Sequence, residues 1–164
     1  MKVRIKKTRI DAVMPTKAHT DDAGFDLTAV RYEVDKEGNH VYYTGLAFEI
    51  PKGYVGLLFP RSSNAKKDLL LSNSVGVLDS CYRGEVLFKF KPSLKHDLLD
   101  IDYETASYPI PRYGTSYDEC PKVYQEYERI GQLIIIPYPE IEFEEVDELS
   151  DSDRGDGGWG STGK

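Results

Sequence analysis

The chain has 164 residues, 40% of them hydrophobic and 30% charged, and its formal net charge is −7 at pH 7. This length predicts one domain large enough to bury its own core. The acidic balance argues against a surface for duplex nucleic acid, which needs basic patches to displace counterions. Two cysteines are too few for a disulfide framework, no segment approaches the ~20 apolar residues of a membrane helix, and the N-terminus lacks an apolar leader. We therefore expect a cytoplasmic protein without nucleic-acid or membrane partners.

Short apolar or alternating runs, separated by Gly, Pro, Asn and Asp, predict an all-β chain. In chain order the predicted strands are KVRIKKTRI (2–10), GLAFEI (45–50), YVGLLF (54–59), EVLFKF (85–90), QLIIIPY (132–138) and IEFEEV (141–146). One short helix is predicted in SSNAKKDLL (62–70). Many short strands with turn residues between them are typical of a sandwich, a barrel or a jelly roll.

Two segments interrupt this pattern. Residues 95–126 are rich in tyrosine and have no clear periodicity, so we interpret them as an inserted loop, solvated or functional, between two strands. Residues 140–153 carry eight acidic side chains and predict a solvated linker. The expected organisation is a β core over 1–139 that includes the inserted loop, then the acidic linker, then a glycine-rich arm over 154–164.

The arm, RGDGGWGSTGK, contains most of a phosphate-binding P-loop signature, G-x-x-x-x-G-K, at 158–164. That signature works where a strand precedes the loop and a helix follows it, but no Ser or Thr follows Lys164 in this sequence. Two interpretations are left open. The arm is either a flexible glycine-rich end, which is common, or a mobile segment that wraps an anionic ligand held elsewhere.

Two motifs in the core carry groups that suit phosphate or a metal ion. PRSSNAKK (60–67) offers a guanidinium, two hydroxyls and free backbone amides to a phosphate, or forms a short helix with a serine N-cap. TDDAGFDLTA (20–29) places Asp26 after a glycine turn. Its carboxylate either belongs to a turn before a strand or binds the waters of a hydrated magnesium ion.

A third motif, NSVGVLDSCYRGEV (73–86), consists of two short strand-like runs joined by a turn. Asp79 follows the first run, either as a turn residue, which is the commoner case, or as a chemical base. Tyr82, three residues later, is expected to face the same pocket. The side-chain amide of Asn73 offers both a donor and an acceptor, which suits the edge of a pyrimidine.

Taken in order, five motifs resemble those of the trimeric dUTP nucleotidohydrolases, or dUTPases. They are DAGFDL (22–27), PRSS (60–63), NSVGVLDSCYRGEV (73–86), ERIGQLI (128–134) and RGDGGWGSTG (154–163). The resemblance extends over nearly the whole chain except the inserted loop. It implies a β-clip jelly roll, a homotrimer whose arms close over neighbouring sites, and hydrolysis of dUTP to dUMP and pyrophosphate with magnesium. Such a reaction keeps uracil out of DNA and supplies dUMP.

The resemblance also implies roles for single residues. Asp79 would be the general base that activates a water for in-line attack at the α-phosphorus. Tyr82 would pack under the deoxyribose and exclude a 2′-hydroxyl, and Asp26 would bind magnesium through its waters. In a tight hairpin, the uracil edge would be read by Asn73, Val77, Leu78 and Leu87.

The remaining implied roles concern the triphosphate and the arm. The phosphate chain would be held by Arg61, Ser62, Ser63 and Gln132. The γ-phosphate would be clamped by Arg154, Ser161 and Thr162, with Gly160 among the glycines that let backbone amides approach it. Trp159 would stack on uracil, an interaction worth ~1–3 kcal/mol per base.

The sequence departs from the family pattern at three motif positions. Trp159 stands where phenylalanine is usual, Ser63 where glycine is frequent, and Gly131 where alanine is usual. We expect Gly131 to loosen its surroundings slightly.

Two other functions are compatible with parts of this pattern. A dCTP deaminase shares the Arg-Ser-Ser run but uses a glutamate where this chain has Lys89, and Tyr82 with the arm favours the dUTPase. A regulatory protein gated by a nucleotide would use arm closure to alter a partner surface. The intact set of Asp79, Tyr82 and Arg154 favours catalysis, with or without such regulation.

Overall fold

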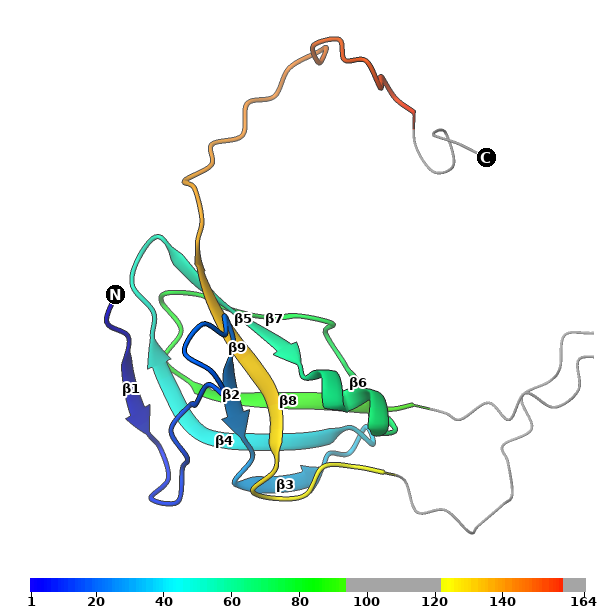
Figure 1. The fold of residues 1–164 in the computed structure, drawn as a ribbon. Coiled ribbons are helices and arrows are strands. Elements are labelled where there is room, and N and C mark those ends of the chain that lie inside the picture. Colours follow the sequence, from blue (N-terminus) through cyan, green and yellow to red (C-terminus); the bar gives the residue numbers. More distant parts are fainter. Residues whose placement is uncertain (94–121, 158–164) are drawn as a thin grey trace, which may run out of the picture.

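The computed structural model of the protein describes residues 1–93 and 122–157, and Figure 1 shows their arrangement. These residues form strands and one turn of helix. In chain order the elements are β1 (Arg4–Lys7), β2 (Phe25–Thr28), β3 (Arg31–Val34), β4 (His40–Glu49), β5 (Tyr54–Pro60), the 3-10 helix η1 (Ser62–Lys66), β6 (Leu69–Leu71), β7 (Gly76–Leu78), β8 (Glu85–Pro92) and β9 (Arg129–Pro137).

The strands form two antiparallel sheets. The five-stranded sheet has the order β1-β4-β8-β6, with β3 also paired to β4, and the four-stranded sheet has the order β2-β9-β5-β7. Strands that follow one another in sequence often belong to different sheets, so the chain crosses repeatedly between the two layers. This all-β architecture confirms the predicted jelly roll.

The core lies between the sheets and is built by alternation along the strands. In β8, Val86, Phe88 and Phe90 are buried, while Leu87 and Lys89 point to the other face. The rings of Phe88 and Phe90 stack with centroids 6.2 Å apart. Because successive side chains of a strand point to opposite faces, this alternating burial confirms the strand that the sequence predicts for EVLFKF.

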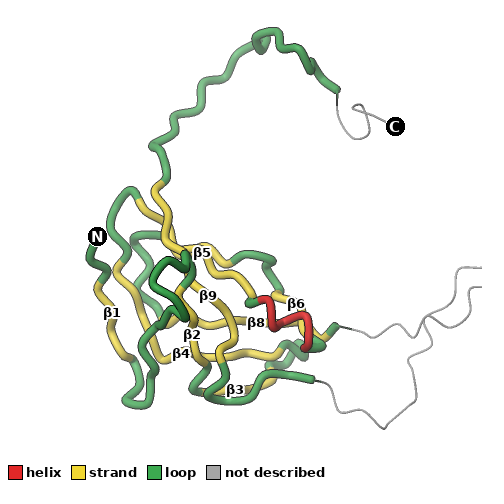
Figure 2. The backbone as a smooth tube through the Cα atoms, in the orientation of Figure 1, coloured by secondary structure: helices red, strands yellow, loops and turns green. Residues whose placement is uncertain are grey.

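The predicted short helix is present in the first part of the segment SSNAKKDLL, as the 3-10 helix η1. Only η1 is helical, as the single red turn in Figure 2 shows, and no described helix is long and apolar enough to cross a membrane. Its N-cap is Arg61, without a side-chain capping bond, so the predicted serine N-cap is wrong. Leu69 and Leu70, the last residues of that segment, belong to β6 and pair with Pro92 and Lys91 of β8.

Residues 141–146, expected to form a strand, are wrongly predicted. Ile141 and Phe143 are 65% and 93% exposed, and the segment runs away from the core without strand pairing (Figure 1). A strand needs a neighbour for its backbone hydrogen bonds. Within the described parts of the chain, none lies beside this segment.

The last residues of the predicted insertion belong to the core. Most of 95–126 lies outside the described residues, but Tyr124 is only 2% exposed and its ring meets those of Tyr42 and Phe90. The Tyr42 hydroxyl donates a hydrogen bond to the Tyr124 carbonyl over 3.1 Å. The chain therefore packs into the core again at Tyr124, before β9 begins at Arg129.

Candidate active site

Three neighbouring strands place the predicted phosphate and metal residues in one row. Asp26 of β2 pairs with Gln132 of β9, which pairs with Phe59 of β5. Directly opposed residues of antiparallel strands project to the same side, and so does Arg61, two residues after Phe59. Leu27, the next residue of β2, is fully buried on the opposite face. The sheet itself therefore brings together side chains from motifs one, two and four.

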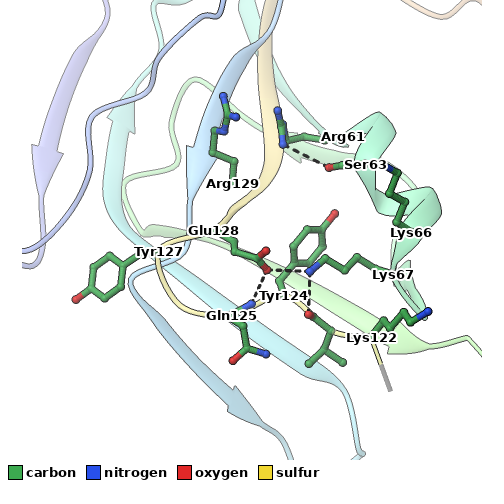
Figure 3. A pocket seen from close by; sticks show the side chains of 11 residues that line it. Arg61, Ser63, Lys66, Lys67, Lys122, Tyr124, Gln125, Tyr127, Glu128 and Arg129 are labelled. Atoms are coloured by element: carbon green, nitrogen blue, oxygen red, sulfur yellow. Dashed lines mark hydrogen bonds and ion pairs between the residues drawn. The ribbon is translucent and has the colours of Figure 1, made fainter. Parts of the chain in front are cut away.

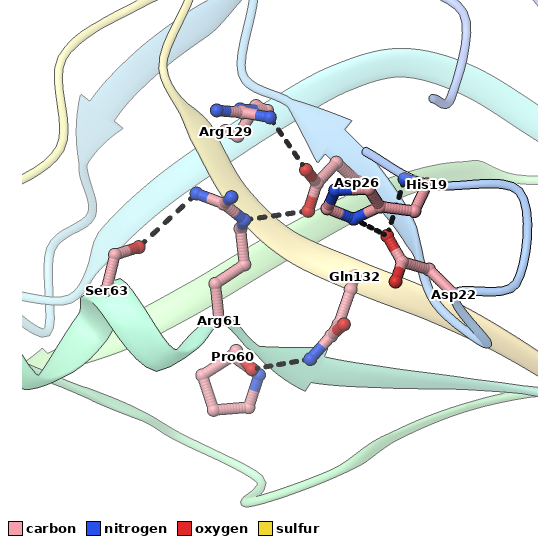
Figure 4. A network of polar contacts seen from close by, with 8 residues as sticks. All are labelled: His19, Asp22, Asp26, Pro60, Arg61, Ser63, Arg129 and Gln132. Atoms are coloured by element: carbon pink, nitrogen blue, oxygen red, sulfur yellow. Dashed lines mark hydrogen bonds and ion pairs between the residues drawn. The ribbon is translucent and has the colours of Figure 1, made fainter. Parts of the chain in front are cut away.

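At the centre of this row, Asp26 is held between two arginines (Figure 4). Arg61 Nε donates to Oδ1 over 2.7 Å, and Arg129 Nη1 donates to Oδ2 over 3.0 Å. The Asp26 side chain is 13% exposed, against 25% for Arg61 and 51% for Arg129. Charge-assisted bonds of this kind fix the carboxylate and leave other guanidinium N–H groups for an anion.

Ser63 and Gln132 complete the polar row. Arg61 Nη1 donates to Ser63 Oγ over 3.3 Å, and Gln132 Nε2 donates to the Pro60 carbonyl over 3.4 Å. A Cβ at Gly24 would lie 2.4 Å from Gln132 Oε1, so the motif-one glycine is needed for this packing. Ser62, the first residue of η1, is exposed.

A pocket of about 670 Å³ opens between η1 and the segment that leads into β9. Figure 3 shows Arg61 and Arg129 pointing the same way at its edge. Its walls are mainly cationic and aromatic, formed by Arg61, Ser63, Lys66, Lys67, Lys122, Val123, Tyr124, Gln125, Tyr127, Glu128 and Arg129. A concave surface with several cations suits a polyphosphate.

Lys67 and Glu128 join the two walls of this pocket. Lys67 Nζ donates to Glu128 Oε2 over 2.9 Å and to the Val123 carbonyl over 3.0 Å. Burial acts to raise the pKa of Glu128, but the hydrogen bonds from Lys67 and from the Gln125 N–H outweigh it, so the pKa is lowered. The Lys67 ammonium also lies 4.7 Å from the centre of the Tyr124 ring.

The predicted uracil residues lie elsewhere, around a second pocket of about 290 Å³. Asn73 and Leu87 both line it, together with Leu58, Leu71, Ser72, Gly76, Phe88 and Lys89. Leu78 and Val77 are not among the residues that line it: Leu78 is buried in β7, whereas Val77 points to the other face of the strand and is 60% exposed. This pocket is small and mostly apolar, and Asn73 is one of its few polar lining residues.

Strands β7 and β8 do not form the tight hairpin that the sequence suggests. β7 pairs with β5 in the four-stranded sheet, and β8 pairs with β4 and β6 in the other sheet. The connection 79–84 therefore crosses between sheets. It carries Asp79, which is exposed, and Tyr82, which is 46% exposed and donates its hydroxyl to the Glu85 carbonyl over 3.1 Å.

Asp79 and Arg61 lie at opposite ends of β5. Leu78 pairs with Gly56, so Asp79 continues toward the start of β5, whereas Arg61 follows its end. The rise along an extended strand from Gly56 to Arg61 is about 17 Å. Arg61 also points across the sheet to Asp26 and not along β5 (Figure 4). One chain therefore does not bring the predicted base and the predicted phosphate groups to a common point.

The start of the predicted arm lies away from both pockets. Arg154 Nε donates to the Gly157 carbonyl over 2.9 Å, and Gly155 has a left-handed φ of 54°. Residues 138–157 extend from the end of β9 into solvent (Figure 1). The other predicted arm residues, Trp159, Gly160, Ser161 and Thr162, lie outside the described residues.

Three residues of this site, Arg129, Lys67 and Glu128, are not among those predicted from the sequence. Arg129 lies within ERIGQLI, from which only Gln132 was selected, yet it binds Asp26. The available signal was a charged residue in the same motif, three positions before Gln132 and just before the strand predicted over 132–138. The bond between Lys67 and Glu128 had no local signal, because the two residues are distant in sequence.

The donor set around Asp26 fits a magnesium ion bound through water. Magnesium prefers oxygen ligands and keeps several waters, so one carboxylate plus substrate phosphates can hold it. No group of three His, Cys, Asp or Glu that could hold a metal is found among the described residues. Each Asp26 oxygen accepts a bond from one arginine and, with two lone pairs, can accept another from water.

Comparison with known proteins identifies relatives along the whole chain. The dUTPase family model matches residues 11–99 and 115–163. The Deoxyuridine 5'-triphosphate nucleotidohydrolase of Nautilia profundicola is 37% identical over 166 residues, covering 100% of both chains. That of Corynebacterium glutamicum is 37% identical, covering 98% of this chain and 95% of its own.

The chain is also similar to solved structures of dUTPases. The Staphylococcus bacteriophage 80alpha dUTPase with dUPNHPP has a TM-score of 0.74 and 30% identity, covering 99% of each chain. A mutant dUTPase of phage phi11 of S. aureus, described with a structural Mg(II) ion, has a TM-score of 0.65 and 25% identity, covering 91% of this chain and 99% of its own. With a family model over most of its length, full-length relatives and a shared jelly roll, this chain belongs to the dUTPase family.

Proposed function

We propose that the chain hydrolyses dUTP to dUMP and pyrophosphate at a site assembled from more than one copy of the chain. The observation that carries this proposal is the row formed by Asp26, Arg61 and Gln132, with Arg129 and Ser63 beside it. These side chains offer several N–H and O–H donors on one face of the sheet, which suits the binding of a polyphosphate. The relatives named as nucleotidohydrolases of deoxyuridine triphosphate supply the identity of the nucleotide.

The phosphate half of the site binds and neutralises the triphosphate. Arg61 donates to phosphate oxygens with guanidinium N–H groups other than the Nε–H that binds Asp26, while Ser62, Ser63 and Gln132 add neutral donors. Asp26, bound by Arg129, would hold a magnesium ion through its waters, and such an ion would neutralise charge on the phosphate oxygens. These groups act by electrostatics and positioning, which are the main sources of catalysis in phosphoryl transfer.

The other half of the site, called the base half because it carries the proposed general base Asp79, activates the attacking water. Asp79 accepts a proton from a water that attacks the α-phosphorus in line. The bond from the α-phosphorus to the oxygen that bridges it to the β-phosphorus breaks, and pyrophosphate leaves with that oxygen. A positioned base contributes ~10²–10⁴-fold, so most of the acceleration comes from the phosphate half and from orientation.

The small apolar pocket recognises the pyrimidine. Its volume of about 290 Å³ accommodates one ring, and Asn73 and Leu87 are among the residues that line it. Val77 and Leu78 contribute backbone groups. Tyr82, on the sheet-crossing connection, packs against the deoxyribose and excludes a 2′-hydroxyl, which separates dUTP from UTP.

The two halves meet when copies of the chain associate. Because Asp79 and Arg61 lie at opposite ends of β5, a substrate held by the phosphate half of one chain meets the base half of another. A homotrimer satisfies this geometry with three equivalent sites. The arm closes each site, with Arg154, Ser161 and Thr162 on the γ-phosphate, Gly160 at the backbone approach and Trp159 on uracil.

The decisive experiment is release of pyrophosphate from dUTP, dCTP and UTP with magnesium, for the wild type and for Asp79→Asn. We expect release from dUTP alone, and its loss in the variant, because an amide cannot take the proton from water. Release of ammonia from dCTP would reassign the chain to the deaminases. Tight binding of dUTP without turnover in the wild type would exclude the hydrolase.

A regulatory role beside catalysis has one supporting observation. The similar phage 80alpha structure belongs to phage dUTPases described as controlling transfer of virulence genes by a proto-oncogenic G protein-like mechanism. In this chain, the nucleotide would then alter a partner surface through the arm. A pull-down with and without a non-hydrolysable dUTP analogue tests it: a partner released by the analogue supports the role, and no partner in either state excludes it.

A further inference from the structure

Arg83 lies four residues after Asp79 and contacts the same connection between β7 and β8. Its Nη1 donates to the Ser80 carbonyl over 2.6 Å and to the Tyr82 carbonyl over 2.8 Å. Its Nη2 lies 3.9 Å from Glu49 Oε1, at the end of β4. One guanidinium thus joins both ends of the turn Ser80–Tyr82 and faces a carboxylate of the five-stranded sheet.

The connection needs such a support because strand pairing does not hold it. Leu78 ends in one sheet and Glu85 begins in the other, so residues 79–84 have no ladder on either side. A single backbone bond, from the Tyr82 N–H to the Asp79 carbonyl over 3.0 Å, closes the turn. Gly84 lets the Tyr82 ring fold back, since a Cβ there would lie 2.3 Å from the Tyr82 hydroxyl oxygen.

We infer that Arg83 is a positioning residue for the reaction: it fixes the turn so that Asp79 and Tyr82 keep their places relative to the bound nucleotide. The inference rests on the proposed function, because it concerns the base and the ribose contact of that site. The ion pair with Glu49 directs the guanidinium, but both side chains are well exposed, 53% and 42%, so this pair adds little stability. The two charge-assisted bonds to carbonyls carry the effect.

Steady-state kinetics of Arg83→Ala, Arg83→Lys and the control Arg4→Gln test this role. Arg4 shares the Glu49 carboxylate over 3.1 Å and is 83% exposed, but it has no bond to the turn. We expect Arg83→Ala to lower kcat by ~10-fold to ~10²-fold, the scale expected for a displaced group. KM should change far less, and the preference for dUTP over UTP should fall because Tyr82 is also displaced.

The variants separate positioning from stability. Arg83→Lys keeps three N–H donors that can reach a carbonyl and should recover part of kcat, while Arg4→Gln should leave kcat unchanged. A fall in melting temperature of Arg83→Ala with unchanged kcat and unchanged dUTP preference would overturn the inference. If Arg83→Ala does not fold, Arg83→Met replaces it, because methionine keeps the unbranched side chain but has no N–H donor. A kcat and a dUTP preference of Arg83→Met equal to those of the wild type would reject the inference. An inactive wild type would instead reject the proposed function.

Discussion

At the scale of single residues, Gly131 fills a role opposite to the loosening that its sequence suggests. A Cβ at this position would lie 2.1 Å from Cε1 and 2.3 Å from Cζ of Phe88, whose ring is 1% exposed. The aromatic ring therefore occupies the space that an alanine methyl would take. The missing side chain at Gly131 in β9 makes room for the Phe88 ring of β8 in the other sheet. The packing here is tight, so the prediction of a looser motif four is wrong.

Gly131→Ala should therefore destabilise the protein. The added methyl forces the Phe88 ring or β9 to move, and overpacking of this kind typically costs about 1–3 kcal/mol. Denaturant unfolding followed by fluorescence measures the change. A midpoint equal to that of the wild type would contradict the packing described here.

A double-mutant cycle gives the matched control. Phe88→Leu alone removes core volume and should also destabilise, but in the Gly131→Ala background it relieves the clash. The combined loss should be smaller than the two single losses added together. Simple additivity would mean that the methyl and the ring do not meet.

At the scale of elements, η1 is a single helical turn without a side-chain cap, and its position depends on contacts with the segment before β9. The bond from Lys67 to Glu128 joins them, and the same segment carries Arg129 to Asp26. This bond therefore places the serines of η1 relative to the carboxylate of β2. Short helical turns have little stability of their own.

The stability of this junction should depend on pH. The pKa of Glu128 is lowered from 4.5, so its contribution is complete above that pH and is lost as the pH falls through the lower folded value. Between about pH 5 and pH 3, the wild type should thus lose more stability than Glu128→Gln, which cannot titrate. Glu142→Gln, in the exposed segment after β9, controls for the change in net charge. Equal pH dependence in all three proteins would rule the contribution out.

The elements also show what the sequence could predict and what it could not. β5, β8 and β9 follow apolar periodicity, and that local signal was sufficient. The short helix near 62–70 is also confirmed, but its end could not be predicted, because Leu69 and Leu70 are strand residues only through their pairing with β8. The site residues were found through motifs, but Arg129 was missed, since its role depends on the register between β2 and β9. Contacts between distant segments have no local pattern.

At the scale of the whole molecule, the separation of Asp79 from Arg61 predicts complementation between inactive variants. Asp79→Asn chains keep the phosphate half, and Arg61→Gln chains keep the base half. In trimers refolded from an equal mixture, about a quarter of the sites should combine two intact halves, if each site draws the halves from different chains. Pyrophosphate release from dUTP measures the recovery.

The controls for this experiment are the two variants refolded separately. Each should remain inactive, because every site then lacks the same half. An inactive mixture, with trimers confirmed by sedimentation, would place both halves of each site within one chain.

The separation of the two half-sites at opposite ends of β5 has a consequence for damaged chains. In the proposed assembly, the two ends of β5 serve two different sites, so each chain is shared by neighbours. A chain that is damaged in both halves would impair the site that receives its aspartate and also the site that receives its arginine. Defective copies of this kind would then remove more activity than their number suggests.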